Sequence, residues 1–184
     1  RGLGDVYKRQ LIYLFICALF VFCSCNDDDK IDYTAPGILA GEWWVTYYQE
    51  TVPDKWEVIG DYKNLPLYTY NSAANKADEL FVDDLGEFWD FKVKAFANPG
   101  ALSFGSDAEL PNLSYEDCNV VITEGKVMFN AAKSKTGIVT DSICFKVKFS
   151  DDSEQLVYKV EGHKRTGWTD DESVSYTHLR AHET

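Results

Sequence analysis

The amino-acid sequence predicts an all-β domain, built as an antiparallel up-and-down barrel of about eight strands. Two observations predict this fold class. Short runs of aromatic and β-branched residues recur along the chain, and several alternate apolar with polar positions, which is typical of strands with one buried face. Turn-forming residues separate the runs, and helical periodicity is almost absent. Because closure of such a sheet removes its exposed edges, we expect a barrel, with a β-sandwich as the alternative.

The predicted strands are short and closely spaced. Eight segments have the composition of strands: residues 43–48, 67–70, 80–82, 88–94, 120–123, 126–130, 143–149 and 156–161. In the fourth segment, alternation places Trp89, Phe91 and Val93 on one face. Glu124-Gly125 is expected to form a two-residue hairpin turn, because glycine readily takes positive φ. Residues 97–117 are rich in turn formers and are expected to form a long loop with one short strand.

The N-terminal part of the chain has the features of a bacterial lipoprotein signal. Leu11 to Cys23 is an apolar run of 13 residues, which is too short for a membrane span of about 20 residues and suits the core of a signal peptide. The run leads into Phe22-Cys23-Ser24-Cys25, which resembles the lipobox of bacterial lipoproteins. The resemblance implies cleavage before Cys25 and acyl chains on its thiol, which would anchor the protein to a membrane.

These features divide the chain into five parts. Residues 1–10 and 174–184 resemble translated sequencing-adapter strings and are expected to carry no function. Residues 11–24 are the expected signal peptide. Residues 25–37 hold the expected acylated cysteine and an acidic tether, and residues 38–173 form the expected barrel domain.

Three consecutive acidic residues, Asp27, Asp28 and Asp29, lie next to the expected lipidation site. One interpretation is a solvated tether, which the like charges keep extended. The other is that the cluster resembles the surface-export signal of lipoproteins in one Gram-negative phylum. The second interpretation implies that the protein is lipid-anchored at the outer membrane and exposed on the cell surface, which is the expected location.

Charge and cysteine content argue against several classes of partner and cofactor. The chain carries 18 Lys and Arg against 30 Asp and Glu, a net charge of −12, which opposes nucleic acid and anionic lipid surfaces as partners. Cys118 and Cys144 are expected to be buried or half-buried thiols, because a predicted strand separates them and a disulfide needs Cα atoms within about 7 Å. The sequence has no Cys/His cluster with metal-site spacing, so no metal or cofactor is predicted.

One motif links the two ends of the predicted barrel. Gly41-Glu42-Trp43 opens the first strand, and Arg165 follows the last. This pairing resembles the lipocalin and wider calycin pattern, in which a Gly-x-Trp tryptophan closes the barrel floor beneath an arginine from the final strand. The resemblance implies that Trp43 packs beneath Arg165 in a cation–π contact.

A closer resemblance covers most of the domain, from Gly41 to Gly167. The segments GEWWVTYYQE, YNSAANKADELFVDDLGEFWDFKVK, TDSICFKVKFSD and VEGHKRTG are similar to a family of lipocalin-like lipoproteins described as lipid-binding putative hydrolases. The resemblance implies a calycin-type barrel and a hydrophobic ligand, and it raises hydrolysis as an activity.

An apolar barrel interior with a few polar anchors suits a small hydrophobic ligand. The expected ligand-binding residues are the aromatic side chains of the inner face: Trp43, Tyr47, Trp89, Phe91, Phe145, Phe149 and Tyr158. The open alternative is that these side chains fill the barrel completely. The predicted partners are a small hydrophobic ligand or lipid and, through Cys25, a membrane.

No catalytic set is predicted, but a hydrolase acting on a lipid or ester is an alternative. A serine hydrolase needs a base beside its nucleophile, and His163 is the candidate, although strand alternation points its side chain to solvent. Asp83 and Asp90 are the other candidates, as the paired carboxyls of a glycoside hydrolase or as solvated turn residues. A third function class is a surface module for a glycan or protein, which exposed aromatic residues would support: Trp44, Tyr48 and Trp56.

Overall fold

The structure, a computed structural model, describes residues 34–172. These residues form one antiparallel sheet with two short 3-10 helices, η1 (Gly37–Leu39) and η2 (Pro99–Ala101). The strands are β1 (Gly41–Val52), β2 (Lys55–Val58), β3 (Leu65–Tyr70), β4 (Glu79–Asp83), β5 (Lys92–Asn98), β6 (Ser103–Pro111), β7 (Asn119–Lys133), β8 (Val139–Phe149) and β9 (Tyr158–Lys164).

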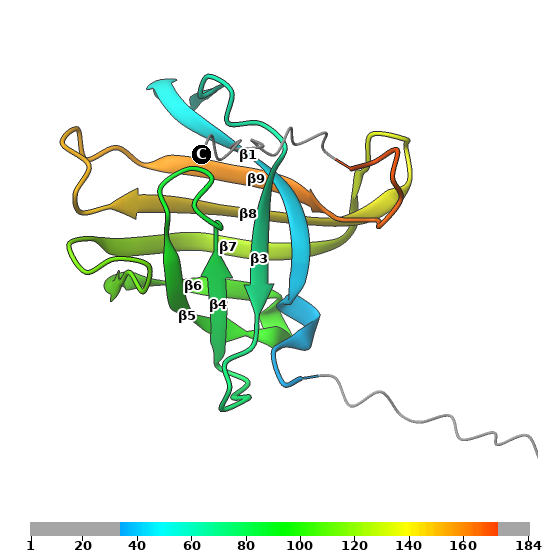
Figure 1. Ribbon diagram of the computed structural model, residues 1–184, viewed down its shortest axis with the longest axis horizontal. Helices are drawn as coiled ribbons and strands as arrows, with labels where there is room; N and C mark the ends of the chain where they lie inside the picture. Colours follow the sequence, from blue (N-terminus) through cyan, green and yellow to red (C-terminus); the bar gives the residue numbers. More distant parts are fainter. Residues whose placement is uncertain (1–33, 173–184) are drawn as a thin grey trace, which may run out of the picture. The chain divides into compact units, whose positions relative to one another are not determined.

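The sheet closes on itself, because β1 pairs with β9 as well as with β3. The short strand β2 pairs only with the second half of β1, so eight strands make the barrel and each neighbours the next one along it. In Figure 1, β7, β8 and β9 run alongside one another, and β3, β4 and β5 cross them steeply on the other side of the barrel. The predicted all-β, up-and-down barrel is therefore confirmed.

The core lies inside the barrel and follows the alternation of the strands. On β8, Ile143, Phe145, Val147 and Phe149 are all buried, and the residues between them are less buried or face outward. The same alternation holds on β5, β7 and β9. Such a pattern is what a period of two requires when one sheet face meets a core.

The predicted hairpin turn at Glu124-Gly125 is wrong. Strand β7 continues through these residues, and its register with β8 shifts by one residue between Thr123 and Lys126, which is a β-bulge with Glu124 at φ 56°. Glycine is needed at 125 because of a close approach rather than a turn. A Cβ there would meet the carbonyl oxygen of Phe104 at 2.3 Å.

Two predicted boundaries also differ from the structure. Residues 88–91 belong to the loop between β4 and β5, because the backbone N–H groups of Phe88, Trp89 and Phe91 bond to the Asp84 side chain and not to a neighbouring strand. Residues 97–117 contain the predicted strand, β6, but at nine residues it is longer than the short strand expected within a long loop. Gly105, at φ 125°, lies at one of the register shifts in the β6–β7 ladder, which explains why turn-forming residues occur within a strand.

Several predictions concern parts of the chain outside the described residues. The expected signal peptide, the lipidated Cys25, the acidic cluster at 27–29 and both terminal segments lie there. Within residues 34–172, no helix has the length and apolar character needed to cross a bilayer. Cys118 and Cys144 are both free thiols, buried and half-buried respectively, as predicted.

Candidate functional site

The floor of the barrel is organised by Trp43, whose side chain is fully buried. Its indole Nε1 donates a hydrogen bond to Thr69 Oγ1 at 2.9 Å, and the Thr69 hydroxyl donates to the carbonyl of Leu39 at 2.7 Å. These bonds connect the tryptophan to η1, which precedes β1 and contributes the buried side chain of Leu39. The Gly-x-Trp motif therefore positions η1 at this end of the barrel.

The cation above Trp43 is Lys164 and not Arg165, so the predicted partner was wrong by one residue. The Lys164 ammonium lies 5.8 Å from the centre of the Trp43 ring, and the two residues face each other across the β1–β9 ladder. Tyr158 and Val160 point inward from β9, and steps of two residues place Lys164 on the same face. Arg165 therefore falls on the outer side.

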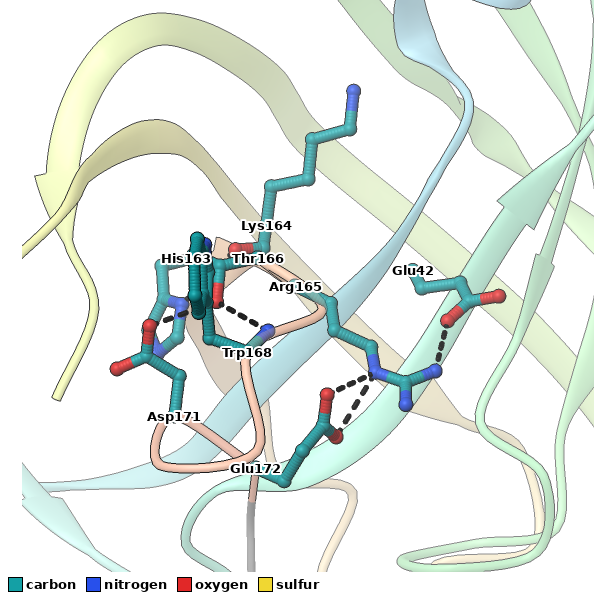
Figure 2. A network of polar contacts seen from close by, with 8 residues as sticks. All are labelled: Glu42, His163, Lys164, Arg165, Thr166, Trp168, Asp171 and Glu172. Atoms are coloured by element: carbon teal, nitrogen blue, oxygen red, sulfur yellow. Dashed lines mark hydrogen bonds and ion pairs between the residues drawn. The ribbon is translucent and has the colours of Figure 1, made fainter. Parts of the chain in front are cut away.

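Arg165 takes part in a different network at the barrel rim. Its Nη1 lies 2.6 Å from Glu42, and its Nε donates to the two carboxylate oxygens of Glu172 at 2.7 and 2.9 Å. Hydrogen bonds from Arg165 to Glu172 and Glu42 raise the pKa of the guanidinium. Figure 2 shows the side chains of Lys164 and Arg165 pointing away from each other, as alternation requires. The predicted floor residue Gly41 lies on the Lys164 side, where a Cβ would approach the Lys164 and Trp43 side chains at 3.2 and 3.1 Å.

The seven expected ligand-binding residues belong to the core or pack against it, and four of them contact one another: Trp89, Phe91, Phe149 and Tyr158. Trp89 stacks on Phe149 with ring centres 4.7 Å apart, and Phe91 contacts Phe149 at 5.4 Å. Phe145 instead contacts Phe104, at 5.7 Å. All but Trp89 are buried: Trp43, Tyr47, Phe91, Phe145, Phe149 and Tyr158. Their role in ligand binding stays a prediction.

Phe88, which was not singled out from the sequence, closes the end of the barrel opposite the floor. Its ring stacks on Tyr47 at 4.2 Å between ring centres and meets Tyr158 edge-on at 5.1 Å. It also contacts Tyr62, Trp89 and Phe149. The Tyr47 hydroxyl beneath it is buried and has no hydrogen-bond partner among the described residues.

A single buried carboxylate, Asp84, holds this closing loop in place. Its Oδ1 accepts backbone N–H bonds from Gly86 and Phe91, and its Oδ2 accepts bonds from Phe88 and Trp89, at 2.8 to 3.3 Å. Burial raises the pKa of Asp84 by more than these four bonds lower it. Asp84 is therefore a structural carboxylate of the β4–β5 loop, and its side chain is turned inward.

The three candidates for catalysis lie apart from this core. Asp83 accepts a hydrogen bond from Tyr70 at 2.8 Å and pairs with Lys92, and Asp90 is exposed at φ 48°. The outer-face position expected for His163 is confirmed, and its Nδ1 lies 3.2 Å from the Lys164 carbonyl. Within the described part of the chain, no three His, Cys, Asp or Glu residues gather as a metal site would require.

The aromatic residues proposed for a surface module are partly covered. Trp44, Tyr48 and Trp56 are all half-buried. The Lys159 ammonium lies over the rings of Tyr48 and Trp56, at 5.0 and 5.5 Å from their centres. These contacts use the aromatic faces that a glycan would otherwise stack on.

A cavity of about 620 Å³ opens at the floor end, outside the Trp43 layer. We call it the end pocket. It lies between η1, the β5–β6 connection and β7, and its lining residues are Thr34, Ala35, Gly37, Ile38, Pro99, Phe129 and Lys164. Ile38 and Phe129 are exposed apolar side chains that give it an apolar wall.

A second, polar cavity of about 410 Å³ shares Lys164 with the end pocket. We call it the rim pocket, and its lining residues are Glu42, Lys164, Arg165, Thr166 and Gly167. Neither pocket was predicted from the sequence. Alternation along β9 could have placed Lys164 at the floor, but the approach of η1 and Phe129 depends on the tertiary fold.

Comparison with known families agrees with this architecture. The model of a family described as "Lipid-binding putative hydrolase" matches residues 28–169. Curated protein sequences give no match. The matched region covers most of the chain and all nine strands of the closed sheet. The chain therefore belongs to the lipid-binding putative hydrolase family.

Proposed function

We propose that this protein is a lipid-anchored outer-membrane lipoprotein, exposed at the cell surface, which binds a small hydrophobic or lipid-like molecule in the end pocket. The observation that carries the proposal is the apolar pocket of about 620 Å³ at the floor end. Its volume lies within the range of about 300–1,000 Å³ that is usual for small-molecule sites. The family match to lipid-binding proteins supports the same class of ligand.

The end pocket is a better candidate than the barrel interior. The interior aromatic side chains stack on one another at 4.2 to 6.1 Å between ring centres, and Phe88 covers them. A ligand inside the barrel would first have to displace these contacts. The walls of the end pocket, Ile38 and Phe129, are already exposed, so a ligand can cover them without rearrangement of the core.

The position of the end pocket suits a ligand taken from a membrane. Thr34 lines the pocket and lies nine residues after Cys25. An extended chain spans at most about 3.3–3.6 Å per residue, so acyl chains on Cys25 would hold the pocket within about 30 Å of the bilayer. Membrane lipids would then be the most concentrated hydrophobic molecules near the pocket.

Mass spectrometry of an organic extract from the purified protein tests this proposal. We expect a discrete lipid-like molecule to co-purify with the wild type and to be lost from Phe129→Asp, because a carboxylate in the apolar wall has to be desolvated when the ligand binds. Phe96→Asp is the matched control, since Phe96 is 57% exposed, Phe129 is 47% exposed, and Phe96 does not line the pocket. Retention of the molecule by Phe129→Asp would refute the site.

One observation favours hydrolysis as a second candidate function. Ser142 lies directly opposite His163 in the β8–β9 ladder, and its buried hydroxyl has no hydrogen-bond partner within residues 34–172. A hydroxyl beside an imidazole is the pairing that a serine nucleophile needs. Turnover of a model ester that is lost in both Ser142→Ala and His163→Ala would support this candidate, and turnover that survives both changes would exclude the pair.

A further inference from the structure

We infer that the ligand of the end pocket is an anionic amphiphile whose negatively charged headgroup pairs with Lys164. The inference rests on the proposed function and specifies its substrate class. It follows from three properties of Lys164. It is the one ionisable residue that lines the end pocket, its ammonium has unused hydrogen-bond donors, and it lines both pockets.

The first property is the charge of the pocket lining. The protein carries a net charge of −12, yet none of the seven residues that line the end pocket is acidic, and Lys164 is the one ionisable side chain among them. A cation at an apolar surface attracts an anion more strongly than the same cation in water, because the local dielectric constant is lower. The lining therefore selects for one negative charge next to an apolar chain.

The second property is that the Lys164 ammonium has unused hydrogen-bonding capacity. Its ion pair with Asp141 is long, at 3.7 Å, and the other oxygen of Asp141 accepts the backbone N–H of Asn130 at 3.1 Å. The face of Trp43 supplies a cation–π contact but no hydrogen-bond acceptor. A lysine ammonium carries three donors, so it can bind a carboxylate or phosphate oxygen without breaking either contact.

The third property is the position of Lys164 between an apolar and a polar cavity. The end pocket offers the wall of Ile38 and Phe129, and the rim pocket offers Thr166 and Gly167 beside the same lysine. Arg165 also lines the rim pocket, but Glu42 and Glu172 already balance its charge. Lys164 is therefore the cation available to a headgroup, with the chain on one side of it and solvent on the other.

The test is photolabelling of the full-length protein in phosphatidylcholine nanodiscs, with two probes that carry the same diazirine: palmitic acid and the corresponding alcohol. We expect the acid to label the peptides that contain Ile38 and Phe129 at about fivefold lower concentration than the alcohol, which is the upper range for a partly exposed ion pair. Lys164→Met should remove this difference by weakening labelling by the acid alone, and Lys164→Arg should restore it.

Lys63→Met is the matched control, because Lys63 is exposed and lines neither pocket. It should leave labelling by both probes unchanged. If both probes label the pocket equally, or if Lys164→Met weakens both to the same extent, the headgroup inference is wrong and the hydrophobic site stands. If neither probe labels the pocket peptides in folded wild-type protein, the inference and the proposed function both fail.

Discussion

Lys164 and Trp43 form the cation–π contact at the floor of the barrel, with the ammonium 5.8 Å from the centre of the ring. Trp43→Ala should destabilise the protein by about 3–5 kcal/mol, the usual cost of removing a large buried aromatic side chain. Lys164→Ala should cost about 0.5–1 kcal/mol, because the lysine is partly exposed. Urea unfolding of the single and double variants measures the coupling between the two side chains.

The comparison with Arg165 makes this prediction specific. The Arg165 guanidinium bonds to Glu42 and Glu172, so Trp43→Ala and Arg165→Ala should be additive within about 0.5 kcal/mol. Trp43→Ala and Lys164→Ala should show the larger coupling. A larger coupling energy for Trp43 with Arg165 than for Trp43 with Lys164 would mean that Arg165 contacts Trp43 at the barrel floor.

Gly125 tests the assignment of a bulge in β7. Gly125→Ala should destabilise the protein by about 1–3 kcal/mol, because the new methyl group would lie 2.3 Å from the carbonyl oxygen of Phe104. Gly100→Ala is the control, since a Cβ there would make only an ordinary contact, at 3.5 Å from Asn98. Equal stability of the two variants in thermal unfolding would argue for a solvent-exposed hairpin turn at 124–125.

Asp84 tests how the closing loop is held. Asp84→Asn should destabilise the protein by about 2–6 kcal/mol, because the amide keeps one acceptor oxygen and leaves two of the four backbone N–H groups unpaired, at about 1–3 kcal/mol each. Asp90→Asn, in the same loop but exposed, should change stability by less than about 0.5 kcal/mol. Urea unfolding at neutral pH distinguishes the two.

The pH dependence of the same variant has a definite sign. Burial raises the folded-state pKa of Asp84, so the folded protein holds this proton more tightly than the unfolded chain does. The stability that this tighter proton binding gives to the folded state is fully present below the ordinary pKa of an aspartate, near 3.9. It is lost as the pH rises through the raised pKa of the folded state. The stability advantage of the wild type over Asp84→Asn should therefore shrink with rising pH. An advantage that grows instead would mean that the four N–H bonds outweigh burial.

Cys25 tests the proposed anchor. Cys25→Ser should move the protein from the detergent phase to the aqueous phase of cell extracts or leave it unprocessed, because each buried CH₂ of an acyl chain contributes about 0.8 kcal/mol to membrane binding. Ser24→Ala keeps a small residue before the cysteine and serves as the control. Unchanged partitioning of Cys25→Ser would exclude acylation at that residue.

Local pattern was sufficient to predict the fold class and most of the inner face. Alternation placed Phe145, Phe149 and Tyr158 in the core and His163 outside it, and the structure confirms those positions. The same alternation, continued past His163, would have placed Lys164 on the inner face. The family pattern pointed instead to the neighbouring arginine.

Features that depend on tertiary contacts were missed. The sequence neighbours of Gly125 predict a turn. In the structure, glycine is needed at this position because the carbonyl of Phe104, in another strand, lies close to it. The sequence does not distinguish Asp84 from Asp83 and Asp90, and only the folded loop shows that the Asp84 carboxylate turns inward. The end pocket joins residues 34–38 to Phe129 and Lys164, and no local pattern connects segments so far apart in the sequence.

Locating the bound lipid chain tests most directly whether the ligand lies in the end pocket. Paramagnetic broadening of amide NMR signals by a fatty acid with a nitroxide at its chain end measures this location. We predict the strongest broadening at Gly37, Ile38 and Phe129, which line the end pocket. Strongest broadening at Tyr47, Phe149 and Tyr158 would place the ligand inside the barrel and contradict the end-pocket site.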